Sequence, residues 1–394
     1  MSKILIIGAS VLQLPAIKKA KEMGLEVAVA DYNPNAIGIS YADKYFNVST
    51  IDVEAICNIA REYQPDGIMT LATDMPMRSV AAATTLLGLP GISMATAIKA
   101  TDKGEMIKAF KENNVESPWY FVIQDEMELR ISKQFFSYPC IIKPTDNAGS
   151  RGVTLVHSEE ELFTAYHYAK EHSRGGQVIV EEFLQGQEVS VEIMVVDSLV
   201  HVLAVTDKIT TGAPHFVEMG HSQPSRLSSK DLLRVKDLAV RAVQAIGINC
   251  GPAHVEIMNT SRGPKMIELG ARMGGDSITT HLVPLSTGID MVKATIDIAL
   301  NQEPDILPKW ERGSAIVFFR GTPGIITSIH GEKEALMYNG VKCVEFTKNV
   351  GDRIVDIESS VDRVGYIIAQ AQNGEDALNV CQEAQKCIVI NSIL

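Results

Sequence analysis

The sequence predicts a multidomain protein of mixed α/β and α+β class, on three observations. Residues 1 to about 95 alternate short apolar strands with amphipathic helices, as the units of a parallel sheet do. The middle of the chain alternates apolar and polar residues like antiparallel strands, and the part beyond Trp310 is rich in short strands. A chain of 394 residues with 46% hydrophobic content is long enough for several cores.

The N-terminal part has the order strand, helix, strand, helix, strand, helix. We expect strands at residues 3–7, 26–30 and 67–71, and helices at 14–23, 53–61 and 77–87. This order predicts a parallel sheet, and ligands of such sheets favour the carboxyl ends of the strands, where Gly8, Asp31 and Asp74 lie. The turn after the first strand lacks the second and third glycines of the dinucleotide fingerprint, which argues against nicotinamide binding.

The elements that follow are mixed. Thr101 or Asp102 caps a helix that runs to about residue 113, and Pro118 marks a linker. We then expect strands at 138–144, 154–156, 178–183, 187–196 and 200–206, helices at 158–171, 231–246 and 375–385, and a last strand at 387–390. The expected domains are 1–98, 99–118 (a helix and linker), 119–185, 186–309 and 310–394.

Composition excludes several classes of partner. The net charge is −12 and no basic run is present, so nucleic acid is not an expected partner. No apolar run is long enough to span a bilayer, and the first strand is too short for a signal peptide, so no membrane partner is expected. The six cysteines are scattered without metal-ligand spacing, as reduced thiols are. Together these features predict a cytoplasmic protein.

Glu256 and Glu268 form the most informative pair. Each lies in a short apolar run, and the turn residues 259–264 separate the two runs. A hairpin that turns near Arg262 places both carboxylates on one face, with Cβ atoms about 5 Å apart. Oxygen ligands in that arrangement favour Mg²⁺ or Mn²⁺ completed by substrate phosphates. The alternative is a pair of solvated glutamates on an exposed sheet face.

A glycine-rich loop at residues 147–152 lies between two expected strands. Its glycines free the backbone to approach a ligand, and successive N–H groups in such loops can cradle phosphate oxygens. The alternative is a plain hairpin turn, but two lysines accompany the loop, one on the entering strand and one on the preceding helix. The candidate phosphate-binding residues are Lys103, Lys143, Gly149, Ser150, Arg151 and Gly152.

A third segment, residues 181–188, ends one strand and begins the next. Its backbone can hydrogen-bond an adenine edge, and a carboxylate can accept from ribose hydroxyls; a polar turn is the alternative. The candidate nucleotide contacts are Glu181, Glu182, Phe183, Leu184 and Glu188.

In this order the motifs resemble those of the ATP-grasp superfamily of ATP-dependent carboxylate–amine ligases. The runs 216–221 (FVEMGH) and 268–276 (ELGARMGGD) look like the L-amino-acid-ligase branch, near the carbamoyl-phosphate-synthetase-like proteins. The resemblance covers essentially the whole chain. It implies an ATP-grasp fold with an N-terminal preATP domain, a nucleotide lid, a metal-bearing central domain and a C-terminal β-rich domain.

The resemblance also implies roles and cofactors. Lys103 and Lys143 would contact the phosphates of ATP, and Glu256 and Glu268 would bind Mg²⁺ or Mn²⁺. The catalytic candidates are Lys143 and Arg272, and Arg272 would stabilise the transferring phosphoryl group. One departure matters, because many relatives carry asparagine two residues after the second glutamate and this chain has Gly270. A second metal ion would therefore rely more on water or substrate.

The implied reaction joins a small carboxylate, such as an amino acid, to an amine through an acyl phosphate, with ADP and phosphate as products. Candidate substrate contacts are His215, Glu218, His221 and Arg320. One of the histidines could orient or deprotonate the amine, although a surface role for a loop histidine is an equal alternative. The rival readings are purine-nucleotide or biotin-type carboxylation chemistry and a catalytically degenerate ATP-binding protein. By analogy with ATP-grasp relatives, we expect a homodimer.

Overall fold

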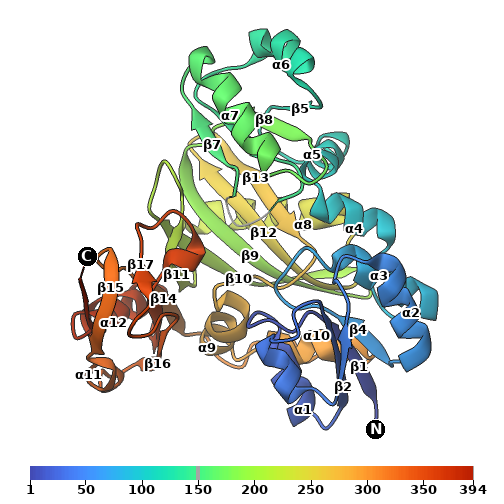
Figure 1. Ribbon diagram of the computed structural model, residues 1–394, viewed down its shortest axis with the longest axis vertical. Coiled ribbons are helices and arrows are strands. Elements are labelled where there is room, and N and C mark those ends of the chain that lie inside the picture. Colours follow the sequence, from blue (N-terminus) through green and yellow to red (C-terminus); the bar gives the residue numbers. More distant parts are fainter. Residues whose placement is uncertain (148–150, 394) are drawn as a thin grey trace.

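A computed structural model describes residues 1–147 and 151–393 of the chain (Figure 1). The described part contains four sheets: one parallel sheet of four strands, an antiparallel sheet of four, a large sheet of eight and a small sheet of three. The expected mixed α/β and α+β class is therefore confirmed. No helix in these two ranges is both long enough and apolar enough to cross a bilayer.

The N-terminal sheet is parallel, as expected, with the strand order β3-β2-β1-β4. Its central strands β1 and β2 are apolar except at their ends and are buried after their first residue, because helices cover both faces. Strand β3 was not expected from the sequence, because its residues are partly exposed at the sheet edge. The bounds are β1 Lys3–Ile7, α1 Leu14–Glu22, β2 Glu26–Asp31, β3 Lys44–Asn47, α2 Val53–Tyr63, β4 Gly67–Met69 and α3 Met77–Leu87.

Two helices and an antiparallel sheet follow. Asp102 caps the helix that starts at Lys103, as expected, and accepts a hydrogen bond from the backbone N–H of Glu105. The sheet has the order β5-β8-β6-β7, and it forms the top of the molecule as drawn in Figure 1. The bounds are α4 Met94–Thr101, α5 Lys103–Glu112, β5 Tyr120–Ile123, α6 Glu126–Ser132, β6 Cys140–Pro144, β7 Thr154–Val156, α7 Glu159–Glu171 and β8 Val178–Glu182.

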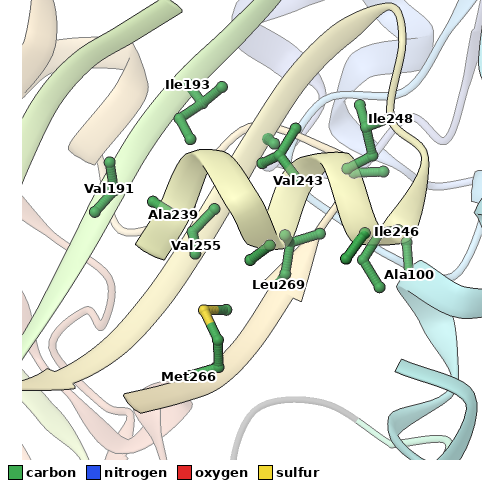
Figure 2. Packing of buried hydrophobic residues seen from close by; sticks show 14 of the residues in the cluster. Ala100, Val191, Ile193, Ala239, Val243, Ile246, Ile248, Val255, Met266 and Leu269 are labelled. Carbon is green, nitrogen blue, oxygen red and sulfur yellow. The ribbon is translucent and has the colours of Figure 1, made fainter. Parts of the chain in front are cut away.

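The large sheet has the order β13-β12-β9-β10-β11-β14-β18-β16 and runs on past residue 310. Apolar side chains of β9, β12 and β13 pack against helix α8 on one face, as Figure 2 shows, and the opposite face carries both polar residues, such as Glu188 and Glu256, and the apolar Met194. The bounds are β9 Gly186–Val196, β10 Leu199–Thr210, β11 Glu218–Gln223, α8 Ser229–Ile246, β12 Gly251–Thr260, β13 Gly263–Gly270, β14 Gly313–Phe319, β16 Val341–Phe346 and β18 Gly365–Ala371.

The remaining elements complete the core around this sheet. Helix α10 packs against the N-terminal sheet, and α12 packs against β14 and β18. The small sheet has the order β17-β15-β19. The bounds are α9 Val283–Thr287, α10 Met291–Ala299, β15 Gly324–His330, α11 Glu332–Leu336, β17 Arg353–Ile354, α12 Gly374–Gln385 and β19 Val389–Ile393.

Candidate active site

The hairpin β12–β13 places Glu256 directly opposite Glu268, as the sequence predicted. The route to this register differs from the expectation. Thr260 pairs with Gly263, so the turn holds two residues, and strict pairing from there would set Glu256 against Ile267. A β-bulge in β13 adds one residue and shifts the register, so that Glu268 becomes the partner.

The bulge also separates the two faces of β13. Met266 and Leu269 both belong to the core beneath the sheet, although they are three positions apart. Ile267 and Glu268 both line the cavity above it. Strict alternation would place Met266 and Glu268 on one face. The extra residue lets Met266 pack in the core while Glu268 reaches the cavity.

A cavity of about 740 Å³ lies between this face and the antiparallel sheet of β5–β8. Its walls combine apolar side chains, such as Ile141 and Met258, with charged ones, a combination that suits a ligand with a flat apolar ring and an anionic tail. The predicted site residues that line it are Lys103, Lys143, Arg151, Glu181, Glu182, Phe183, Leu184, Glu188, Glu218, Glu256 and Glu268.

Both predicted phosphate-binding lysines carry carboxylate partners. Lys103 Nζ lies 3.1 Å from Glu268 Oε1 and donates a hydrogen bond of 2.8 Å to the carbonyl of Asn147. Lys143 Nζ lies 2.5 Å from Glu181 Oε1, and both side chains are almost buried. Burial lowers the pKa of Lys103, but the charge and hydrogen bond of Glu268, together with the charges of Asp74 and Glu181, outweigh it and the net pKa is raised. Both ammonium groups are therefore oriented by glutamates at the cavity wall.

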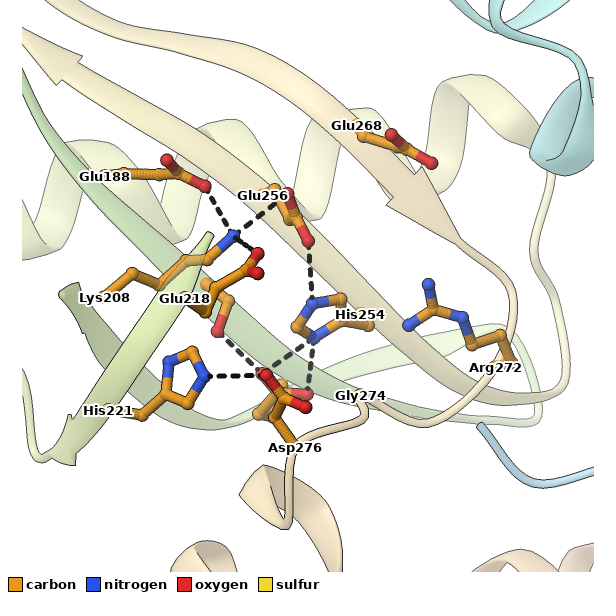
Figure 3. Close-up of polar contacts among 12 residues, drawn as sticks. Glu188, Lys208, Glu218, His221, His254, Glu256, Glu268, Arg272, Gly274 and Asp276 are labelled. Carbon is orange, nitrogen blue, oxygen red and sulfur yellow. Dashed lines mark hydrogen bonds and ion pairs between the residues drawn. The ribbon is translucent and has the colours of Figure 1, made fainter. Parts of the chain in front are cut away.

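A third buried lysine, which the sequence analysis did not select, faces the same cavity. Lys208 on β10 contacts Glu188, Glu218 and Glu256 (Figure 3). The signal that could have identified it is a lysine two positions after the apolar alternation of the strand at 200–206, on a strand that pairs with the one carrying Glu188.

His254 links Glu256 to a second buried glutamate. Its Nδ1 lies 2.9 Å from Glu192 Oε1, and its Nε2 lies 3.2 Å from Glu256 Oε1. Burial lowers the pKa of His254, but the charge of Glu192 and the hydrogen bonds to both glutamates raise it to about 9. The imidazolium therefore donates at both nitrogens near neutral pH. His254 is thus a satisfied buried histidine that also orients Glu256.

Arg272 lies beside the hairpin, just after β13. Its Nε and Nη2 each donate a hydrogen bond of 2.9 Å to Asp74, from the loop after β4. Burial lowers the pKa of Arg272, but Asp74 more than offsets this, so the guanidinium stays charged. Asp74 also lines a second cavity of about 470 Å³, whose lining shares Lys103 and Glu268 with the first. Arg272 itself lines neither of these two cavities, and its partner Asp74 brings it next to the second one.

A second network lies on the C-terminal side of the site. Arg363 donates hydrogen bonds of 2.7 Å to both carboxylate oxygens of Asp276, and its guanidinium stacks on the ring of Phe318. His221 Nε2 lies 3.4 Å from the same aspartate, as drawn in Figure 3. Arg363 also donates to the backbone carbonyl of Glu218, so the network connects β18 to the cavity.

Several predicted residues lie away from the cavity wall. His215 is exposed in the loop between β10 and β11, and Arg320 is exposed after β14; neither lines the cavity. His221 is buried behind Glu218. Gly152 is described and has a φ of +79°, but Gly149 and Ser150 lie outside the described residues. The C-terminal region contacts the site through Arg363, which pairs with Asp276 and donates to the carbonyl of Glu218, and not through Arg320.

The residues fit a divalent cation that takes its other ligands from phosphates and water. Within the two described ranges, no three His, Cys, Asp or Glu side chains are grouped as a metal site of their own. Glu256 and Glu268 offer oxygen ligands only, opposite each other at the cavity wall, which is the donor set that Mg²⁺ takes beside a nucleotide. The position of Gly270 adds no third ligand.

Comparison with known proteins identifies the fold and its two main parts. Residues 136–281 match the ATP-grasp domain, and residues 317–391 match the L-amino acid ligase C-terminal domain 2. The solved L-amino acid ligase from Bacillus licheniformis superposes with a TM-score of 0.86 at 22% identity, over 100% of this chain and 99% of that one. This similarity of structure shows the fold.

Curated relatives include enzymes of two kinds. The alanine–anticapsin ligase of Bacillus subtilis (strain 168) is 26% identical over 314 residues, which is 74% of this chain and 66% of that protein. The formate-dependent phosphoribosylglycinamide formyltransferase of Proteus mirabilis is 26% identical over 268 residues, 62% of each. The chain thus spans less than two thirds of the length of these relatives.

The fold and the domain match define residues 136–281 as an ATP-grasp domain. Residues 317–391 are a C-terminal domain of the type found in L-amino acid ligases. ATP and Mg²⁺ are the cofactors of ATP-grasp enzymes, as the sequence predicted, and an ADP complex occurs among the similar structures. The resemblance recognised in the sequence is confirmed.

Proposed function

We propose that the protein is an ATP- and Mg²⁺-dependent ligase that joins a small carboxylate, such as an amino acid, to an amine. The observation that carries the proposal is the wall shared by the two cavities, where Lys103 and Glu268 lie within reach of both. A nucleotide in the larger cavity and a small acid in the other would meet at this wall. The match of residues 317–391 to the L-amino acid ligase domain supports an amino acid as the acid.

The residues present suit phosphoryl transfer to a carboxylate. Lys103 and Lys143 would hold phosphates, and Glu256 and Glu268 would hold Mg²⁺, which supplies charge neutralisation when bound. Arg272, whose Nε and Nη2 are held by Asp74, supplies a fixed positive charge that can stabilise the oxygens of the transferring group. The carboxylate oxygen attacks the γ-phosphorus, ADP leaves, and the amine then displaces phosphate from the acyl phosphate.

The remaining assignments belong to the same proposal. The segment 181–184 would contact adenine, and Glu188 would accept from the ribose hydroxyls. Glu218, which lines the cavity, is the substrate contact that we retain, whereas His221 is buried, does not line the cavity and would act by holding Asp276. His215 and Arg320 are not retained, because both are exposed and neither lines the cavity. We also propose the domain limits given above, with the boundary near residue 310 falling within one continuous sheet.

The direct test is phosphate release from Mg-ATP with pairs drawn from a panel of amino acids and small amines, with mass spectrometry of the product. We expect ADP, phosphate and an amide or dipeptide for at least one pair, and no turnover in Glu268→Gln. Release of AMP, or phosphate release that no acid stimulates, would contradict the proposal.

The formyltransferase relative supports a second candidate, an ATP-grasp enzyme that acts on a purine-pathway ribonucleotide. The same assay separates the two, because formate with glycinamide ribotide would then stimulate phosphate release while amino acids would not. Stimulation by bicarbonate would indicate carboxylation chemistry instead. ATP binding without any stimulated hydrolysis would indicate a degenerate site.

A further inference from the structure

Lys208 is the most deeply buried of the three lysines Lys103, Lys143 and Lys208 that line the larger cavity. Its Nζ lies 2.5 Å from Glu188 Oε1, 3.2 Å from Glu256 Oε2 and 3.4 Å from Glu218 Oε1 (Figure 3). The lysine side chain is 3% exposed, whereas the three glutamates are 22–27% exposed. The ammonium group therefore lies beneath three carboxylates that border the cavity. Three negative charges share one positive charge there.

Both oxygens of Glu256 already have charged partners. Oε2 contacts Lys208, and Oε1 contacts His254 Nε2 at 3.2 Å. A cation that binds Glu256 must therefore replace or weaken one of these two contacts. Which of the two contacts, with Lys208 or with His254, is replaced decides which side chain competes with the metal for Glu256.

Lys208 is the partner that can yield. His254 is held at its other nitrogen by both oxygens of Glu192, at 2.9 and 3.0 Å, and Glu192 is fully buried. Lys208 instead has a flexible stem and keeps two other carboxylates when it leaves Glu256. Burial lowers the pKa of Lys208, but its three glutamates raise it well above the ordinary value, so the group is charged at neutral pH.

We propose that Lys208 is a positioning residue that serves as an internal counter-ion for the metal-binding carboxylate. Its ammonium group neutralises Glu256 while no metal is bound and gives Glu256 up to Mg²⁺ that arrives with the nucleotide. The inference rests on the proposed nucleotide and metal roles of this cavity. Phosphates supply additional ligands to the metal, so a nucleotide favours the exchange. Metal alone should bind weakly, because it must compete with the ammonium group.

The test measures Mn²⁺ binding by electron paramagnetic resonance in the absence of nucleotide. Lys208→Met should bind Mn²⁺ about tenfold more tightly than the wild type or better, because the competing charge about 3 Å from Glu256 is gone. The matched control is Lys265→Met, which removes a lysine of β13 whose partner Glu182, at 2.5 Å, lines the cavity. This control should bind Mn²⁺ as the wild type does. A lysine with a merely structural role predicts unchanged or weaker binding.

Two further variants assign the gain and guard against misfolding. Adding Glu256→Gln to Lys208→Met should abolish the gain, because the released carboxylate is then absent. Circular dichroism checks that Lys208→Met folds. If it does not, the double variant Lys208→Met/Glu188→Gln is compared with the single variant Glu188→Gln, because one fewer carboxylate is then left without a partner. The double variant should again bind Mn²⁺ more tightly than its single-variant reference.

Binding linkage gives a second readout. If ADP favours the exchange, it lowers the Kd for Mn²⁺ in the wild type. In Lys208→Met the effect of ADP on this Kd should be smaller, by about the same factor by which the substitution lowers the Kd without nucleotide. Unchanged or weaker nucleotide-free binding in a folded variant would overturn the proposal, as would a gain that survives Glu256→Gln. Neither measurement requires an acid or an amine, so failure of the ligase reaction and failure of this inference remain distinguishable.

Discussion

Arg272 donates two hydrogen bonds to Asp74, a residue 198 positions earlier in the chain. The bidentate contact fixes the plane of the guanidinium next to Glu268, and burial strengthens its field. A lysine at this position would keep the charge but lose the fork.

We therefore expect Arg272→Lys to lower the rate of ligation by about 100-fold or more, as the loss of a transition-state donor does. The measurement is phosphate release at saturating ATP with the best substrate pair. Arg234→Lys, on an exposed arginine of α8, is the control and should keep wild-type activity. Full activity in Arg272→Lys would remove Arg272 from the mechanism.

Gly274 and Gly275 offer a matched pair for the packing around His254. A Cβ on Gly274 would lie 2.6 Å from His254 Nδ1 and 2.9 Å from Glu192 Oε2, whereas a Cβ on Gly275 would meet no atom within 4 Å. Neither residue has a positive φ, so only the available space differs.

Gly274→Ala should lower the free energy of unfolding by about 1–3 kcal/mol, as overpacking in a buried site does. Gly275→Ala should stay within about 0.5 kcal/mol of the wild type. Urea unfolding followed by circular dichroism measures both. Equal stability of the two variants would show that the His254–Glu192 contact tolerates displacement.

At the scale of elements, the ion pair of Asp276 and Arg363 joins the loop after β13 to the start of β18. Burial raises the pKa of Asp276, but the hydrogen bonds and charges of Arg363 and His221 outweigh it and depress the pKa. A carboxylate with a depressed pKa in the folded state stabilises the fold above its unfolded pKa of about 3.9. This stabilisation is lost as the pH falls below that value toward the folded pKa.

Asp276→Asn should therefore cost about 2 kcal/mol at pH 7, where the wild type holds the full ion pair. The difference should stay constant down to about pH 5. It should narrow below about pH 4, because the carboxylate of the unfolded wild type takes up a proton there and this favours unfolding. Urea midpoints at pH 7, 5 and 3 test this. Asp356→Asn, on an exposed aspartate, should show no such trend; a pH-independent gap for Asp276→Asn would contradict the ion-pair account.

At the scale of the whole molecule, residues of α5, the antiparallel sheet and the large sheet all line the larger cavity. A ligand bound there contacts several parts of the chain at once. Because it binds only the folded state, its binding free energy adds to the stability of all of them.

Mg-ADP at about 100 times its Kd should stabilise the protein by about 2.7 kcal/mol and raise Tm in a concentration-dependent way. Chelation of the metal should remove part of the shift. In Glu268→Gln the shift should be smaller, because one metal ligand is lost. A Tm that does not respond to Mg-ADP would contradict nucleotide binding in this cavity.

The sequence by itself determined the features that depend on short-range order. The periodicity of apolar residues predicted the parallel N-terminal sheet, helices such as α3 at Met77–Leu87, and the hairpin that carries Glu256 and Glu268. These depend on neighbours a few positions apart, which a pattern displays directly. Edge strand β3 escaped prediction because partial exposure removes the apolar signal.

Only the tertiary structure decided which charges meet. The pairs Arg272–Asp74 and Arg363–Asp276, and the contact of Lys208 with Glu256, join residues that are far apart in the sequence. No local period encodes such contacts, because they arise from the order of the strands in the large sheet and from the packing of loops against it. Even the register of Glu256 and Glu268 depends on a bulge that keeps Met266 and Leu269 in the core, so packing beneath the sheet sets the geometry of the carboxylates above it.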